Sequence, residues 1–170
     1  MSEVYLKKAK KTPETGTSET RKIVERMLSE IEIGKETIAK KYASDLDGFN
    51  GDIIVSQESI DNASKMVPEK LKDDIKFAHE RIKKFAEAQK QSISEFETEL
   101  SPGLWAGQKL IPIQTAGCYV PGGRYAHVAS AIMSITTARV AGVENIIACS
   151  APKGEDGPNP AILYLSLIHI

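Results

Sequence analysis

The residues best suited to chemistry form one short turn, Tyr119-Val120-Pro121-Gly122-Gly123. An apolar stretch typical of a β-strand precedes the turn, and a stretch typical of a helix follows it. Open α/β sheets bind ligands at the carboxyl ends of their strands. Two glycines let the backbone approach a ligand closely and leave amide groups free to point at it. The tyrosine ring could lie against a flat base or a ribose while its hydroxyl forms a hydrogen bond.

The turn matches no common phosphate-binding motif. It is not a GxGxxG fingerprint, and no Gly-Lys-Ser/Thr follows that would make it a P-loop. The residues alone therefore leave two interpretations open, a ligand-binding turn and a plain tight turn. Arg124 and His127 come directly afterwards and could meet an anion. A surface arginine and a histidine at the start of a helix explain them equally well.

The sequence assigns no catalytic residue and no metal ligand within this chain. Cys118 and Cys149 do not make a disulfide framework, and both lie in apolar, strand-like stretches that predict buried thiols. His169 has no Asp, Cys or His at ligand spacing, so it predicts no zinc site.

The overall composition predicts a cytoplasmic globular protein. The net charge of −1 implies no general attraction to nucleic acid or to an acidic membrane. No apolar run reaches the ~18 residues that a membrane span needs. The first residues are basic but contain no apolar segment of the kind found in a secretory signal.

Charge is distributed unevenly along the chain. The first 100 residues hold 18 Lys and Arg and 20 Asp and Glu, whereas the last 70 hold four and three. The first part therefore predicts solvated helices. The second part predicts buried structure that needs other elements packed on both of its faces.

The spacing of apolar residues predicts the individual elements. Three helices are expected first, over 18–44, over 57–66 with Ser56 as N-cap, and from Pro68 to about residue 92. Pro102 and Gly103 then break the pattern. A strand over 110–120, a helix over 127–141 capped by Gly142, a strand over 145–149 and a helix from Asn159-Pro160 follow. This β-α-β-α order predicts a parallel sheet covered by helices.

From about Arg81 to Leu163 the sequence resembles the histidinol dehydrogenase family. The most specific match runs from Gly117 to Gly142 and contains the Tyr-Val-Pro-Gly-Gly turn. The other matching features are Phe85, Ala88-Gln89, Pro112-Ile113, Ala116, Ser134, the run from Thr137 to Val143 and the run from Ala161 to Tyr164.

The resemblance implies a fold, an activity and a cofactor. Such enzymes oxidise an alcohol to an aldehyde and then to an acid with two NAD in succession, and the tyrosine of this turn helps bind NAD. That role falls on Tyr119, with Gly122 and Gly123 shaping the pocket. A zinc ion holds the substrate, and a Glu-His pair handles protons. Members are homodimers whose main domains are incomplete Rossmann-like α/β units.

Two departures from the family pattern qualify these expectations. The residues after Gly123, from Arg124-Tyr125 to Val128-Ala129-Ser130, are similar to the branch that oxidises sulfopropanediol, a hydroxylated sulfonate. An arginine there suits an anionic substrate, so Arg124 is a candidate for the residue that selects such a substrate. The family is also more than twice this long, so the zinc ligands and catalytic pair are expected downstream of residue 170.

The expected organisation has three parts. Residues 1–100 are a mobile N-terminus and helical arm, residues 101–164 begin the NAD-binding α/β domain, and residues 165–170 (LSLIHI) are a non-native tail. The chain by itself is expected to be inactive and poorly folded. The alternative is a non-catalytic α/β module that binds a nucleotide or a partner.

Overall fold

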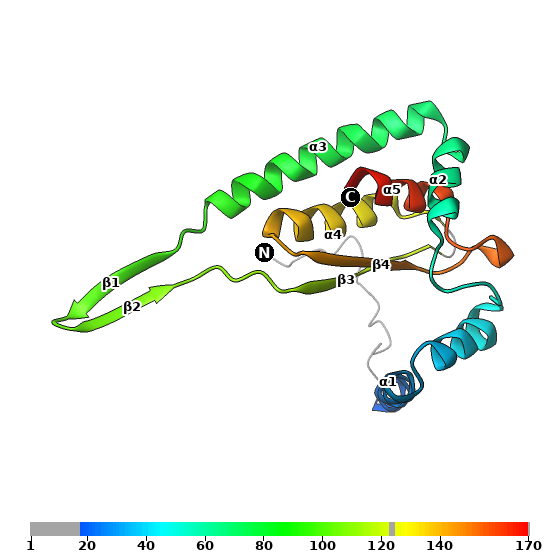
Figure 1. Ribbon diagram of the computed structural model, residues 1–170, viewed down its shortest axis with the longest axis horizontal. Helices are drawn as coiled ribbons and strands as arrows, with labels where there is room; N and C mark the ends of the chain where they lie inside the picture. Colours follow the sequence, from blue (N-terminus) through cyan, green and yellow to red (C-terminus); the bar gives the residue numbers. More distant parts are fainter. Residues whose placement is uncertain (1–17, 123–124, 170) are drawn as a thin grey trace, which may run out of the picture. The chain divides into compact units, whose positions relative to one another are not determined.

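The computed structural model describes residues 18–122 and 125–169 (Figure 1). The chain divides into two compact units, residues 1–42 and residues 43–170. Helix α1 (Ser18–Asp47) begins in the first unit and ends in the second. The sequence predicted one continuous helix here, but Lys35 has φ 51° and ψ −134°, so the helix is interrupted. Gly34 precedes the break, and glycine is a weak helix former.

Two helices open the second unit as the sequence predicted. Helix α2 (Gln57–Met66) begins after Ser56, whose side chain accepts a hydrogen bond from the Ser59 amide at 3.2 Å. Helix α3 (Glu69–Gln91) begins after Pro68 and buries Ile75 and Ala86. The predicted bounds of both helices and the predicted Ser56 cap are confirmed.

A β-hairpin follows that the sequence analysis did not predict. Strands β1 (Phe96–Ser101) and β2 (Leu104–Gln108) pair antiparallel around Pro102 and Gly103, which has φ +81°. Every residue of both strands is exposed. The hairpin was missed although apolar and polar residues alternate in β1, because Pro102-Gly103 was interpreted only as a break in the helical pattern.

The second sheet is parallel, as predicted. Strand β3 (Thr115–Val120) pairs with β4 (Asn145–Ser150), and helix α4 (Val128–Ala141) connects them. The predicted strand over 110–120 was too long, because residues 109–113 have no regular structure. A proline in this segment, Pro112, has no amide hydrogen to donate to a strand ladder.

The chain ends with a short 3₁₀ turn, η1 (Gly154–Asp156), and helix α5 (Pro160–His169). The side chain of Asn159 caps α5 by accepting a hydrogen bond from the Ala161 amide at 2.9 Å, as predicted. Leu165 lies in the segment that the sequence analysis assigned to a foreign tail, and it is fully buried. The origin of that segment stays a prediction.

The core of the second unit lies on one side of the parallel sheet. Helices α4 and α5 lie between the sheet and helices α2 and α3 (Figure 1). The buried residues of this core are Val67, Ile75, Cys118, Val120, Ala131, Ile132, Ile135, Ala161, Ile162, Tyr164 and Leu165. The predicted α/β class, with a helical N-terminal part and a parallel sheet, is confirmed.

Within residues 43–169, no described element covers the other side of the sheet. We call this surface the open face; its residues are Thr115, Gly117, Tyr119, Asn145, Ile147 and Cys149, and all are exposed. The sequence predicted that Cys149 is buried, and in this chain that is wrong. Cys118, on the helix side of the sheet, is buried as predicted. The apolar character of β4 was correctly recognised, but only one of its faces is covered within residues 43–169.

Gly142, the residue at which α4 ends, allows a test of how this helix terminates. Its φ is +96°, and a Cβ there would lie 3.1 Å from Pro112 Cγ. We expect Gly142→Ala to lower the free energy of unfolding by about 1–3 kcal/mol, measured by urea denaturation of the chain, because strain and crowding add.

The matched control is Gly154→Ala. Gly154 also has a positive φ, +65°, but a Cβ there would meet nothing within 4 Å. The free energy of unfolding of Gly154→Ala should fall by only about 1 kcal/mol, from backbone strain alone. Equal losses in both variants would mean that the contact with Pro112 contributes nothing.

Candidate functional site

The turn identified from the sequence lies at the carboxyl end of the parallel sheet. Strand β3 ends at Val120, which is fully buried and pairs with Ser150 at the end of β4. The amide of His127 donates a hydrogen bond to the Pro121 carbonyl at 3.3 Å, so the two ends of the turn meet. Gly123 and Arg124, between them, lie outside the described residues.

Gly122 is the residue that this arrangement requires. It is buried, and a Cβ on it would collide with the Ser150 hydroxyl and lie 2.9 Å from the Ala151 carbonyl oxygen. The backbone of the turn therefore packs directly on the end of β4, which only glycine permits. Steric crowding alone accounts for a glycine at position 122. The contact therefore defines the position of the turn and is not evidence for a ligand.

Tyr119 lies beside this turn with its side chain available. It is 66% exposed and belongs to the open face, where it pairs with Cys149. An exposed aromatic ring at the carboxyl edge of a parallel sheet is where a planar ligand group would stack. The structure brings Tyr119 and Gly122 to one edge of the sheet, as the sequence predicted. Their role in binding a cofactor stays a prediction.

Helix α4 begins immediately after the turn. His127 is its N-cap residue but makes no side-chain hydrogen bond to the first amides. Helix N-termini carry unpaired amides and a partial positive charge, which favour an anion. Ser150 and Tyr125, which is 74% exposed, also lie around this edge and were missed as candidate site residues. For Ser150, the available signal was its position at the end of a second predicted parallel strand.

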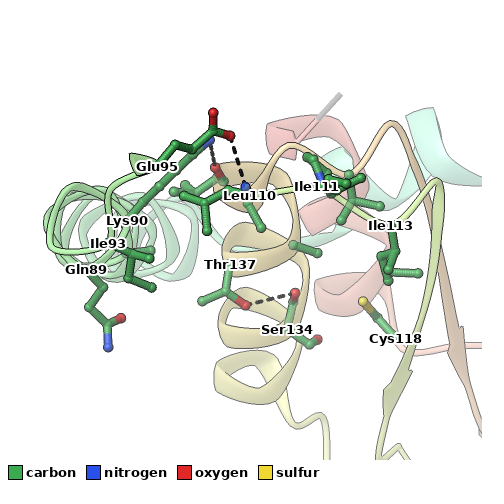
Figure 2. A pocket seen from close by; sticks show the side chains of 17 residues that line it. Gln89, Lys90, Ile93, Glu95, Leu110, Ile111, Ile113, Cys118, Ser134 and Thr137 are labelled. Carbon is green, nitrogen blue, oxygen red and sulfur yellow. Dashed lines mark hydrogen bonds between the residues drawn. The ribbon is translucent and has the colours of Figure 1, made fainter. Parts of the chain in front are cut away.

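A large groove lies elsewhere in the second unit, between the end of α3, helix α4 and residues 110–113. It has a volume of about 890 Å³ and is lined mainly by aliphatic side chains, among them those of Ile93, Ile111 and Ile113 (Figure 2). Neither Tyr119 nor Gly122 lines it. This groove and the sequence-predicted turn are therefore different places.

The two charged side chains that line the groove form hydrogen bonds with the backbone. Glu95 accepts a hydrogen bond from the Leu110 amide at 2.9 Å, and Lys90 donates one to the Val140 carbonyl at 2.8 Å (Figure 2). Val140 lies in the last turn of α4, where carbonyls lack helical partners. Both side chains thus hold the groove's walls together. We interpret the groove as an uncovered packing surface and not as a reaction site.

A metal centre is not formed by the part of the chain that the structure describes. In those residues no three His, Cys, Asp or Glu side chains come together in a way that could hold an ion. Likewise, none of the described helices is both long enough and apolar enough to cross a membrane.

Comparisons with known proteins agree with the sequence pattern. The sequence model of the histidinol dehydrogenase family matches residues 10–169. A histidinol dehydrogenase homolog of Pelagibacter ubique is 53% identical over 96% of this chain and 39% of its own length. A sulfopropanediol 3-dehydrogenase of Ruegeria pomeroyi is 49% identical over 96% of this chain and 38% of its own length.

Solved structures give the same result. The crystal structure of histidinol dehydrogenase from Elizabethkingia anophelis superposes with a TM-score of 0.82 and 29% sequence identity, covering 92% of this chain and 36% of that chain. The chain therefore belongs to the histidinol dehydrogenase family. It spans less than two fifths of the length of these relatives.

The packing of Gly122 on β4 gives a second test. We expect Gly122→Ala to separate the turn from the end of β4 and to lower the urea midpoint of unfolding, because the added methyl meets Ser150 and Ala151. Gly117→Ala is the control, because a Cβ on this strand glycine meets nothing within 4 Å. A midpoint for Gly122→Ala no lower than that of Gly117→Ala would contradict the close approach.

Proposed function

We propose that this chain forms the N-terminal part of an NAD-dependent, zinc-dependent dehydrogenase, which oxidises a primary alcohol through the aldehyde to the acid. The observation that carries the proposal is the turn after β3. In a chain of the histidinol dehydrogenase family, it combines a buried Gly122 with a Tyr119 ring that is 66% exposed at the same sheet edge. The chain supplies the cofactor-binding edge and no catalytic group of its own.

In this proposal each element of the edge has a separate task. The Tyr119 ring stacks on a planar part of NAD, and its hydroxyl remains able to form a hydrogen bond. Gly122 and Gly123 allow the backbone to lie close to the cofactor. The free amides at the start of α4 face negative charge, such as that of a pyrophosphate. NAD, when bound, accepts the hydride that leaves the alcohol carbon.

The zinc ligands and the proton-transferring pair are proposed to lie outside this chain. Zinc is held by His, Cys and carboxylate side chains, usually three or four together. The described residues offer no such group. The side chains of the described residues therefore do not fit the ion, and no step at zinc is assigned to them.

Two substrate classes are open to the proposed enzyme, histidinol and a hydroxylated sulfonate of the sulfopropanediol type. The similarity to the Ruegeria pomeroyi sulfopropanediol 3-dehydrogenase supports the second. Arg124 follows the turn directly and carries a fixed positive charge that suits a sulfonate. We further propose a homodimer in the cytoplasm, with no nucleic acid or membrane as partner.

The role of Tyr119 can be tested in a protein that continues this chain to the length of its relatives. Tyr119→Ala should raise KM for NAD by roughly two- to tenfold, because stacking contributes about 0.5–1.5 kcal/mol, and should leave KM for the alcohol nearly unchanged. Tyr119→Phe should restore most of the affinity, since the ring remains. If Tyr119→Ala changed neither KM nor kcat, the turn would not be the cofactor site.

The role of Arg124 is tested in the same protein. Arg124→Ala should raise KM for a sulfonate substrate by about tenfold or more, as expected for loss of one charge-assisted contact, with KM for NAD unchanged. Arg124→Lys keeps the charge and should show a smaller increase. An unchanged KM for the sulfonate in Arg124→Ala would exclude this residue as the selector.

A further inference from the structure

The break in helix α1 places a lysine in a strained backbone conformation. Among the described residues, Lys35 is the one residue other than glycine that has a positive φ. Its φ of 51° and ψ of −134° lie outside both the right-handed and the left-handed helical regions. A residue stays in such a conformation only where other contacts oppose the strain. The bent form of α1 therefore depends on contacts that hold it.

The local sequence favours a continuous helix through the break. An unbroken helix would place the large side chains of this segment on one stripe, at spacings of three, four and seven residues: Val24, Leu28, Ile31, Ile38 and Tyr42. Lys35 occupies the polar position of that stripe, and lysine is a good helix former. The local preference and the observed conformation thus conflict at this residue, and such conflict favours more than one conformation.

Gly34 is the residue that permits the bent form. A Cβ on Gly34 would collide with the side chain of Ile38 and lie 3.2 Å from the Ile38 Cβ. In a continuous helix the Cβ atoms of residues four positions apart are about 5–6 Å from each other. An alanine at position 34 is therefore compatible with the continuous helix and not with the bent one.

A hydrogen bond connects the two parts of α1 across the break. The Tyr42 hydroxyl donates to Glu30 Oε2 at 2.5 Å. The two residues are 12 positions apart, so a continuous helix would separate them by about 18 Å along its axis. The bond therefore exists only in the bent form. None of the residues of α1 is buried, so this exposed bond acts without the support of a packed core.

We propose that α1 is a two-state arm. In one state the hydrogen bond between Glu30 and Tyr42 holds the bend, and in the other Lys35 is helical and α1 is continuous. The strain at Lys35 and the gain from one hydrogen bond are of similar size, so the two states are close in free energy. The exchange changes the surface of the arm, because the apolar stripe is in line only in the continuous state.

The proposal is independent of the proposed dehydrogenase activity. No residue of α1 belongs to the candidate cofactor site, which is formed by the turn after β3 and the start of α4. A failure of the two-state arm would leave the proposed function intact, and a protein that does not bind NAD would leave the arm intact.

The distance between two spin labels, measured by pulsed electron paramagnetic resonance, tests the exchange. The labels are attached to the 170-residue chain at Lys22→Cys and Lys41→Cys, both exposed positions of α1, with Cys149→Ser. Cys118 is buried and stays unlabelled. A continuous helix sets the labelled positions about 28 Å apart along its axis, whereas the bent form brings them closer together. Circular dichroism and the urea midpoint show that each variant is folded.

We expect the shorter distance to predominate in the starting protein. Gly34→Ala combined with Tyr42→Phe should shift the main distance to about 28 Å, because the bent form then loses its permissive glycine and its hydrogen bond. If this double variant is folded and keeps the shorter distance, the proposal is overturned.

Lys35→Gly and Lys35→Ala form a matched pair, because both remove the charge and only alanine keeps a Cβ. Glycine adopts a positive φ without strain, whereas alanine favours the helix. The ratio of the continuous to the bent state should therefore be about tenfold higher, or more, in Lys35→Ala than in Lys35→Gly. Equal ratios in these two variants would also overturn the proposal, since the backbone of Lys35 would then not control the bend.

Discussion

The parallel pairing of β3 with β4 is the constraint on which the other described features of the second unit depend. Parallel neighbours cannot be joined by a tight turn, so the chain must cross over, and α4 provides that crossover. The crossover places the Tyr119–Gly122 edge beside Ser150 and starts α4 at the same edge. Gly122 lets the turn pack against the end of β4, because any side chain there would meet Ser150 and Ala151. The candidate site is thus a direct product of strand pairing.

A sheet of two parallel strands also leaves apolar surface uncovered. Within residues 43–169, helices cover one face of the sheet, and the open face, the groove beside α3 and the hairpin are exposed. Parallel sheets are normally buried on both faces. The family relatives are more than twice as long as this chain. We interpret the open face and the groove as packing surfaces that no described element of residues 43–169 covers.

Much of this architecture could be predicted from the sequence, and the failures share a cause. Local signals succeeded where one residue dictates the geometry, as with the Ser56 cap, the left-handed Gly142 and the Asn159 cap. The burial prediction failed at Cys149, because an apolar strand sequence does not tell which of its faces is covered within residues 43–169. The turn was located by its residues, whereas Ser150 becomes a neighbour of the site through the parallel pairing of β3 with β4.

The most direct test of the account is NADH formation by a protein that continues this chain to the length of its relatives. The purified protein would be assayed with zinc, NAD and, in turn, histidinol and a sulfopropanediol-type alcohol, with absorbance of NADH as the readout. The account predicts NADH formation with one of these alcohols and its loss when the zinc is chelated. A folded protein that neither binds nor reduces NAD would contradict it, and the turn after β3 would then be a structural feature of a non-catalytic module.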